Sequence, residues 1–338
     1  MYKYIYWYKF ATPTQDYKPV ILLTGGSSEV GIATAKLLSE HPEYRLIVTA
    51  RDLTNITPHI TESDHVWVMP LDVVDEESRK TAVAKIFERW GRVDIYINTS
   101  DICYRSSLEE TKDQDDLLHI QKNYLGPVSL IRMLLPKMRK NGKGKIINIS
   151  SVSGLLAFPT MSSYSASKYA LEGAMEALWY ELRPFGIDVS LVQPGFIHSE
   201  QHSRIKFSES KSTSTDAHDR PYQDMYNDMI PFVASLKNRS LSTPQSIAEL
   251  TYNVIRTERP PLWVPASFDA EFFYYFKRWF PRRIFLPFFY WLLPGSKHWG
   301  QKITRKHDTI WIVRAFRNIV RYLSRRLSPT ELKKSSSS

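Results

Sequence analysis

The chain has 338 residues, a formal net charge of +10 and 43% hydrophobic residues, which is enough apolar side chain for a sizeable core. Its single cysteine, Cys103, excludes an internal disulfide framework and fits a reducing compartment. His198 and His202 have HxxxH spacing, but no cysteine accompanies them, so we expect no metal site.

The charge is unevenly distributed along the chain. Residues 271–338 carry fifteen basic and three acidic residues, whereas residues 1–270 carry thirty basic and thirty-two acidic residues. A nearly neutral body therefore precedes a basic tail, and we expect no nucleic-acid-binding core. The N-terminal segment, 1–17, is aromatic with interspersed lysines and lacks the apolar run of a signal peptide. We interpret it as a segment that packs on the body or touches a membrane surface.

The first unit of the body is a strand, a glycine turn and a helix. Residues 18–23 form a short apolar run, the turn from Thr24 to Gly31 follows, and apolar residues then recur at helical spacing. Glycines in such a turn let the backbone approach a pyrophosphate at the helix N-terminus. The next strand, 45–50, leads to Arg51, near the position that binds the cofactor ribose. Because arginine favours a 2′-phosphate, the sequence predicts NADP(H) as the cofactor.

Strands and helices continue to alternate as far as residue 195. We expect further strands at 66–71, 93–97, 145–150 and 187–192, and helices at 76–90, 113–138 and 163–185. This alternation predicts an α/β fold with a doubly wound, Rossmann-type parallel sheet of about seven strands and helices on both faces. Ligands of such sheets bind beyond the carboxyl ends of the strands.

A group of residues suited to acid/base chemistry follows the strand at 145–150. Ser151 ends that strand, and Tyr164 and Lys168 are four residues apart, which places them on one face of a helix. A phenol has a pKa of about 10 and is a poor proton shuttle near neutral pH, but a neighbouring cation lowers that pKa. The Ser151 hydroxyl could bind the substrate oxygen that Tyr164 protonates. A Tyr-x-x-x-Lys pattern alone also occurs by chance, so the order of the other motifs decides its meaning.

In order and spacing, the motifs of residues 18–265 resemble those of the short-chain dehydrogenase/reductase family. The matching residues are Thr24, Gly25, Gly31, Asp72, Val73, Asn98, Asn123, Ser151, Tyr164, Lys168, Pro194 and Gly195. The resemblance implies hydride transfer between a nicotinamide and a carbonyl or alcohol carbon, with Tyr164 as general acid/base and Ser151 orienting the carbonyl. It also implies that Lys168 lowers the tyrosine pKa and binds the nicotinamide ribose, and that Asn123 holds a water that relays protons.

The same resemblance implies a set of cofactor contacts. Asp72 would accept a hydrogen bond from the adenine amino group, Val73 would lie beside the ring, and Ser199 would face the carboxamide. The residues expected at the cofactor are Thr24, Gly25, Ser27, Ser28, Val30, Gly31, Arg51, Asp72, Val73, Asn98, Tyr164, Lys168, Pro194, Gly195, Ile197 and Ser199. A homo-oligomer is expected from the resemblance alone.

Two positions depart from the family pattern. Glu29 replaces the middle glycine of the turn, and we expect its side chain to point to solvent from the first helical turn, where the helix dipole favours an acid. Asp101 replaces a glycine that follows Asn98, close to the expected nicotinamide ribose, where it would weaken cofactor binding. Because the catalytic set is complete, we expect an active enzyme. The alternative is a nucleotide-binding scaffold or sensor without useful turnover.

Residues 196–240 correspond to the segment that covers the substrate in the family. Its first half is polar, and Tyr222, Met225, Tyr226 and Met229 then recur at helical spacing. The pattern predicts a lid helix that packs on the body, lines an apolar substrate cleft, or does both.

The chain ends in a basic aromatic extension, 266–334, and a short flexible end, 335–338. Thirteen of the residues from 271 to 300 are aromatic, but charges and prolines leave no apolar run of about 20 residues for a transmembrane helix. Apolar residues from Val313 to Leu327 form a stripe with arginines on other faces, which predicts a basic amphipathic helix. That helix would bind an anionic membrane, the body or a second subunit. We expect a cytoplasmic protein and leave peripheral membrane attachment open.

The extension also bears on the substrate. Family members with an aromatic C-terminal extension resemble enzymes of steroids, retinoids and long-chain keto lipids. We therefore expect a small hydrophobic carbonyl or alcohol as substrate. The alternative within the enzyme class is a 3-oxoacyl thioester reductase.

Overall fold

The structure is a computed structural model that describes residues 17–198, 206–207, 221–279 and 281–300. These residues belong to two compact units. The first contains 17–198, 206–207 and 233–276, and the second contains 221–232, 277–279 and 281–300. Residues 1–16, the predicted amphipathic helix at 313–327 and the end at 335–338 lie outside the described residues.

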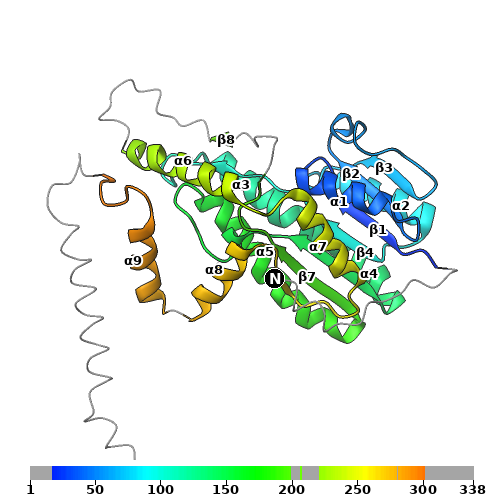
Figure 1. Ribbon diagram of the computed structural model, residues 1–338. Coiled ribbons are helices and arrows are strands. Elements are labelled where there is room, and N and C mark those ends of the chain that lie inside the picture. The colour runs from blue at the N-terminus through cyan, green and yellow to red at the C-terminus, as the bar shows by residue number, and fades with distance from the viewer. Residues whose placement is uncertain (1–16, 199–205, 208–220, 280, 301–338) are drawn as a thin grey trace, which may run out of the picture. The chain divides into compact units, whose positions relative to one another are not determined.

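The first unit is built on a seven-stranded sheet with the order β3-β2-β1-β4-β6-β7-β9 (Figure 1). Its strands are β1 (Val20–Thr24), β2 (Arg45–Ala50), β3 (Val66–Pro70), β4 (Ile95–Asn98), β6 (Gly144–Ile149), β7 (Ile187–Gln193) and β9 (Trp263–Pro265). Every pair of neighbouring strands is parallel. The predicted doubly wound parallel sheet is confirmed. A separate pair of short parallel strands joins β5 (Tyr104–Arg105) to β8 (Lys206–Phe207).

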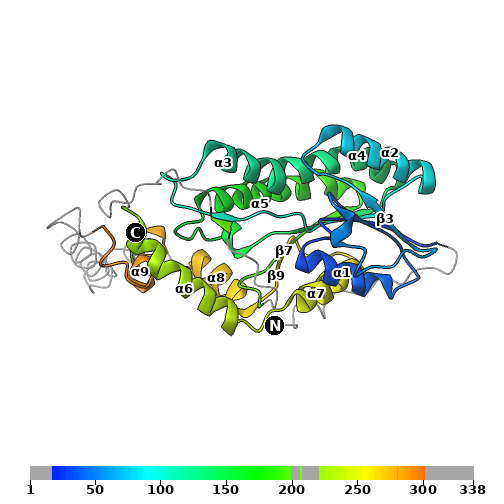
Figure 2. The same cartoon turned by 90° about the horizontal axis from the view of Figure 1, so that it is seen from above.

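Helices cover both faces of the large sheet (Figure 2). One face carries α1 (Glu29–Ser39) and α7 (Pro244–Arg256), and the other carries α2 (Glu76–Trp90), α4 (Gly126–Asn141) and α5 (Ser162–Leu182). Because both faces of the sheet are covered, β1 is buried at all five positions. Leu22 belongs to the core beneath α4 and α5, whereas Ile21 and Leu23 belong to the core beneath α1 and α7, as the two-residue period of a strand requires.

Local capping sets the ends of several helices. The Asp75 carboxylate accepts a hydrogen bond from the backbone N–H of Glu77 and begins α2, and Gly91, with φ of 69°, ends it. Thr243 and Ser246 form a reciprocal capping box at the start of α7. These caps satisfy backbone groups that have no partner within the helix.

The long helix predicted at 113–138 is interrupted. It consists of α3 (Asp113–Ile120), a π-helical turn (Gln121–Leu125) and α4. Gly126 lies immediately after that turn, where a Cβ would come 2.5 Å from the carbonyl oxygen of Val73. The π turn contains Asn123, and such turns are frequent at functional sites.

The second unit contains the start of α6 (Gln223–Arg239) and all of α9 (Arg282–Leu292). Within it, the Trp299 indole donates a hydrogen bond to Asp228 at 2.8 Å, and the rings of Phe285 and Phe289 stack 5.7 Å apart. Helix α8 (Phe268–Trp279) begins in the first unit and ends in the second, so helices are present in the predicted extension. Across the described residues, every helix is too short or too polar to cross a membrane.

Candidate active site

The predicted site residues come from loops at the carboxyl ends of the strands, where the sheet reverses its order between β1 and β4. The turn between β1 and α1 is tight. Gly25 has φ of 77°, and a Cβ there would lie 2.4 Å from the backbone nitrogen of Ser100. Ser28 caps α1 and accepts a hydrogen bond from the N–H of Gly31 at 3.0 Å. This turn therefore brings backbone close to a helix N-terminus, which is a favourable place for phosphate.

A cavity of about 200 Å³ opens beside this turn. It is lined by Gly25, Ser27, Ser28, Ala50, Arg51, Leu71, Asp72, Val73, Thr99, Ser100, Asp101 and Lys122. Six of these residues belong to the predicted cofactor set: Gly25, Ser27, Ser28, Arg51, Asp72 and Val73. Backbone N–H groups, a guanidinium and a carboxylate around one cavity suit a nicotinamide dinucleotide, which carries a pyrophosphate, ribose hydroxyls and an adenine amino group.

Other predicted cofactor residues support the cavity from outside its lining. Asn98 is 1% exposed, accepts a hydrogen bond from the Thr24 hydroxyl at 3.1 Å and donates one to Asn148 at 3.1 Å. These contacts hold β1, β4 and β6 together at their carboxyl ends. Val30 and Gly31 lie within the first turn of α1, and Ser199 lies outside the described residues.

The turn after β7 is fixed from two sides. The carbonyl of Pro194 accepts a hydrogen bond from Val152, next to Ser151, and the N–H of Gly195 donates to the Ser267 hydroxyl at 2.9 Å. A Cβ on Gly195 would lie 2.0 Å from Asp269. Ile197 follows two residues later and packs against the core beneath α1 and α7. Ser267 and Asp269 were not predicted, because they lie more than seventy residues from this turn in the sequence.

The predicted catalytic residues converge beside the cavity. Ser151 accepts a hydrogen bond from the N–H of Ser153 at 3.1 Å, which holds the segment after β6. Tyr164 and Lys168 lie on α5, 6% and 1% exposed, with the ammonium 5.7 Å from the centre of the tyrosine ring. Lys168 also donates to the carbonyl of Ile149 at 3.1 Å. Buried side chains with fixed partners form a preorganised site.

Asn123 ties this site to the π turn. Its side-chain oxygen accepts from the N–H of Ile102, and its amide nitrogen donates to the carbonyl of Ile102, both at 2.9 Å. The same nitrogen also donates to the Ser167 hydroxyl at 3.0 Å. Asn123 therefore fixes the segment around Ile102 against α5.

Asp101 makes contacts that the sequence did not predict. Its carboxylate accepts a hydrogen bond from the Tyr164 hydroxyl at 3.1 Å and pairs with the Lys168 ammonium at 3.2 Å. Burial, followed by the negative charge of Asp101, raises the pKa of Tyr164 well above its ordinary value, and a hydrogen bond with Ser151 opposes the shift. The net shift is upward because burial outweighs the groups that lower the pKa, and a lowering contribution from Lys168 stays a prediction.

Glu29, the other departure from the family pattern, is the first residue of α1 and is half-buried. It is absent from the cavity lining, and its charge acts on Lys237 of α6. Lys122, which does line the cavity, was missed because only its position beside Asn123 marks it in the sequence.

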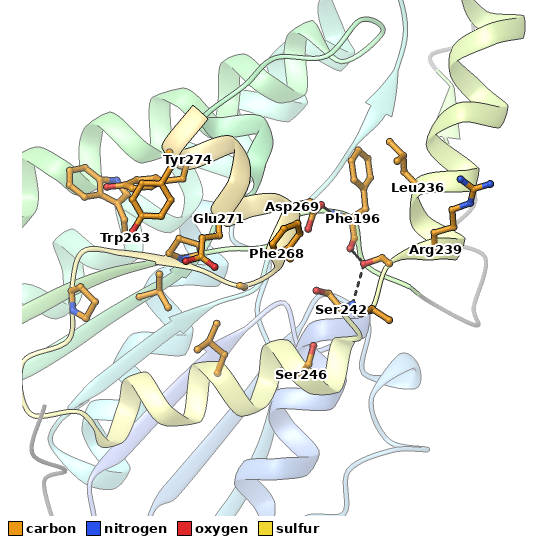
Figure 3. A pocket seen from close by; sticks show the side chains of 18 residues that line it. Phe196, Leu236, Arg239, Ser242, Ser246, Trp263, Phe268, Asp269, Glu271 and Tyr274 are labelled. Carbon is orange, nitrogen blue, oxygen red and sulfur yellow. Dashed lines mark hydrogen bonds between the residues drawn. The ribbon is translucent and has the colours of Figure 1, made fainter. Parts of the chain in front are cut away.

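A second, larger cavity of about 580 Å³ lies beside α7, β9 and the start of α8 (Figure 3). Its lining is mostly apolar and includes Phe196, Leu236, Trp263, Phe268 and Tyr274. None of the predicted catalytic residues lines it. Asp269 and Phe196 lie at its wall, so this cavity borders the turn after β7.

A family model described as short chain dehydrogenase matches residues 19–209 of this chain. The chain belongs to the short-chain dehydrogenase family. Its predicted family membership is therefore confirmed, and the family supports an enzyme that acts on CH–OH or C=O groups with a nicotinamide cofactor. Within the described part of the chain, no cluster of His, Cys, Asp and Glu could hold a metal ion.

Several known proteins and solved structures are similar to this short-chain dehydrogenase. It is 31% identical over 242 residues to the 3-ketodihydrosphingosine reductase of Bacteroides thetaiotaomicron, covering 72% of this chain and 85% of the relative. A solved short-chain dehydrogenase of Streptomyces avermitilis has a TM-score of 0.66 and 31% identity, covering 76% of this chain and 91% of that one. A solved structure of ElxO with NADP bound has a TM-score of 0.58 and 27% identity, covering 74% of this chain and 98% of that one.

Proposed function

We propose that this short-chain dehydrogenase transfers a hydride between NADP(H) and the carbonyl or alcohol carbon of a small hydrophobic substrate, with Tyr164 as general acid/base. The convergence of Ser151, Tyr164 and Lys168 beside the nucleotide cavity carries the proposal. Asp101 connects the catalytic residues to the cavity, because it lines the cavity and contacts both Tyr164 and Lys168.

Each residue of the site has its own role in carbonyl reduction. Bound NADPH supplies the hydride. The Ser151 hydroxyl acts to lower the pKa of Tyr164, so both hydroxyls can face the same carbonyl oxygen, and Tyr164 gives that oxygen its proton. Lys168 places a positive charge beside the phenolate that this transfer leaves. In alcohol oxidation the same proton moves back to Tyr164.

The preference for NADP(H) rests on Arg51. This exposed residue follows β2 and lines the cavity together with Asp72 and Ser27. A guanidinium binds a phosphate through two parallel hydrogen bonds, whereas a ribose hydroxyl is better bound by a carboxylate.

Aromatic side chains around Phe158 favour a hydrophobic substrate. Phe158 lies between Ser151 and Tyr164 in the sequence, and its ring contacts those of Phe196 and Phe273 at centroid distances of 5.8 and 6.1 Å. An apolar wall of this kind favours an apolar ligand. The similarity to a 3-ketodihydrosphingosine reductase favours a long-chain keto lipid as the first substrate to test.

We also propose that the C-terminal extension meets a membrane surface. Leu286, Phe288 and Trp291 of α9 are 61%, 43% and 53% exposed. A short helix with exposed apolar and aromatic residues suits the interface of a bilayer. Flotation with anionic vesicles would support this contact if a Phe288→Ser, Trp291→Ser variant binds less than the wild type, and equal binding would overturn it.

The enzyme proposal is tested by following NADPH oxidation with a panel of carbonyl compounds. The panel contains a long-chain 3-keto lipid, a steroid ketone, a retinal and a 3-oxoacyl thioester. We expect turnover of an apolar ketone or aldehyde by the wild type and its loss in Tyr164→Phe. Preferred turnover of the thioester would favour the alternative reductase. Binding of NADPH without turnover of any carbonyl would favour the nucleotide-binding scaffold.

A further inference from the structure

The position of Asp101 is fixed by its neighbours on both sides. Thr99 donates from its N–H to the carbonyl of Thr24 at 2.9 Å, and Ser100 donates to the Asn98 side chain at 3.1 Å. On the other side, Ile102 exchanges two hydrogen bonds with Asn123. These hydrogen bonds fix the backbone on both sides of Asp101, so its carboxylate is held beside Tyr164 and Lys168.

The contacts of Asp101 differ from those of a surface acid. The Tyr164 side chain is buried and Lys168 is 1% exposed, whereas the Asp101 side chain is 38% exposed. Asp101 thus brings a negative charge from the solvent side to two buried groups that act together in catalysis. A hydrogen bond from a phenol to a carboxylate stabilises the protonated phenol, because only the neutral form donates the proton.

Other titratable groups also face Tyr164. Arg105 and Cys103 follow Asp101 in the same segment; the Arg105 charge acts on the phenol, whereas burial raises the pKa of the Cys103 thiol to about 12, so it acts only at alkaline pH. The ring of His119, on α3, lies 6.4 Å from that of Tyr164. His119 accepts a hydrogen bond from Tyr104 at Nε2 and bonds the carbonyl of Asp115 through Nδ1, so these contacts fit a neutral imidazole.

Lys168 is the cation that would stabilise a phenolate at Tyr164, and Asp101 pairs with it directly. The carboxylate therefore acts on the phenol in two ways that have the same sign. It accepts the phenol's hydrogen bond and offsets the charge of the neighbouring ammonium. Both effects disfavour loss of the phenol proton.

We propose that Asp101 is a positioning residue that keeps Tyr164 protonated and thereby sets the pH dependence of catalysis, with alcohol oxidation confined to more alkaline pH. This inference rests on the proposed function. In reduction, the substrate oxygen takes the Tyr164 proton as the phenol O–H bond breaks, the hydride supplies the electron pair of the new C–H bond, and solvent reprotonates the phenolate. Oxidation needs the phenolate first, so its rate is confined to more alkaline pH.

The first measurement needs no cofactor. Ultraviolet difference titration, with the Tyr164→Phe protein subtracted, follows phenolate formation at Tyr164 alone. We expect Asp101→Asn and Asp101→Gly to lower the titration midpoint by about 1 to 3 pH units. Asp64→Asn removes an equal charge at an exposed position before β3 and should leave the midpoint unchanged.

The second measurement compares the pH profiles of oxidation and reduction. In Asp101→Asn, the oxidation profile should move to lower pH by about the same number of pH units as the titration midpoint. Near-ultraviolet circular dichroism of each variant checks that the fold is retained. Asp101→Asn keeps a side chain of the same shape if Asp101→Gly does not fold.

Equal titration midpoints in the wild type and Asp101→Asn would overturn the inference. Unequal midpoints with unchanged pH profiles would also overturn it, because the charge would then act on the phenol without directing catalysis. A shifted midpoint with no turnover in any variant would support the effect of Asp101 on Tyr164. That last result would count against the proposed enzyme function.

Discussion

The Asp269 carboxylate accepts a hydrogen bond from the backbone N–H of Phe196 at 2.9 Å, across 73 positions of the chain. Asp269 lies in the first turn of α8, where the helix dipole favours an acid, and it packs against Gly195. The start of the C-terminal extension therefore supports the turn that follows β7. In the proposed enzyme this turn faces the nicotinamide.

The contact predicts an effect of Asp269 on cofactor binding. Asp269→Ala should leave the N–H of Phe196 without its partner and loosen the turn, which costs about 1 to 3 kcal/mol. We expect weaker NADPH binding, measured by nicotinamide fluorescence. Asp269→Asn keeps an acceptor oxygen and should lie closer to the wild type. If Asp269→Ala binds NADPH as tightly as the wild type, the turn does not depend on α8.

A second prediction concerns Lys145, a buried residue of β6. Its ammonium donates to the carbonyls of Ile255, at 2.6 Å, and Thr257, and so caps the end of α7. Lys145→Met should leave these carbonyls without a buried donor and lower the free energy of unfolding by about 2 to 4 kcal/mol. Urea unfolding measures this loss. Lys143→Met, an exposed position one residue before β6, should change little, and equal effects of the two substitutions would contradict the prediction.

A third prediction concerns pH. Burial raises the pKa of Glu172 above its ordinary value of 4.5, although Gln193 donates to its carboxylate at 3.0 Å. Between the ordinary and the raised pKa, the folded state binds more protons than the unfolded state, so the contribution of this group to stability falls as pH rises. Glu172→Gln should remove that decline and raise the free energy of unfolding near neutral pH, measured by urea unfolding, by about 1.4 kcal/mol for each unit of the shift.

The control for this prediction is Glu176→Gln, an exposed position on the same helix. It should keep the decline in the free energy of unfolding that we assign to Glu172. A pH dependence that is the same in the wild type and Glu172→Gln would show that the decline comes from other groups.

Local patterns predicted the fold well because they depend on neighbouring residues. The bounds of β2 and α2 match the structure, since one is a short, mostly apolar run and the other has both caps. The three residues of β9 are too few for a recognisable pattern, and their pairing with β7 defines the strand. The π turn at Asn123 also escaped prediction, because side-chain contacts with Ile102 and Ser167 accompany it rather than a helix-breaking residue.

The site was predicted only in part for the same reason. Six cavity residues were identified from motifs that lie next to their own strands. The pairing of Asp101 with Tyr164 joins residues 63 positions apart, and no sequence pattern marks such a contact. Burial, followed by that contact, raises the pKa of Tyr164, so the sequence indicated the reacting group but not its environment.

The last prediction separates the two cofactors. Arg51→Ala removes the guanidinium that we assign to the 2′-phosphate and leaves the rest of the cavity lining in place. Because hydrogen bonds to charged groups contribute about 1.5 to 3 kcal/mol, NADPH binding should weaken roughly 10- to 100-fold, whereas NADH binding should not weaken. Arg45→Ala, exposed at the opposite end of β2, is the matched control and should bind both cofactors as the wild type does. Equal losses of affinity for NADPH and NADH would mean that Arg51 supports the cavity without binding the 2′-phosphate. Tighter binding of NADH than of NADPH by the wild type would overturn the choice of NADP(H).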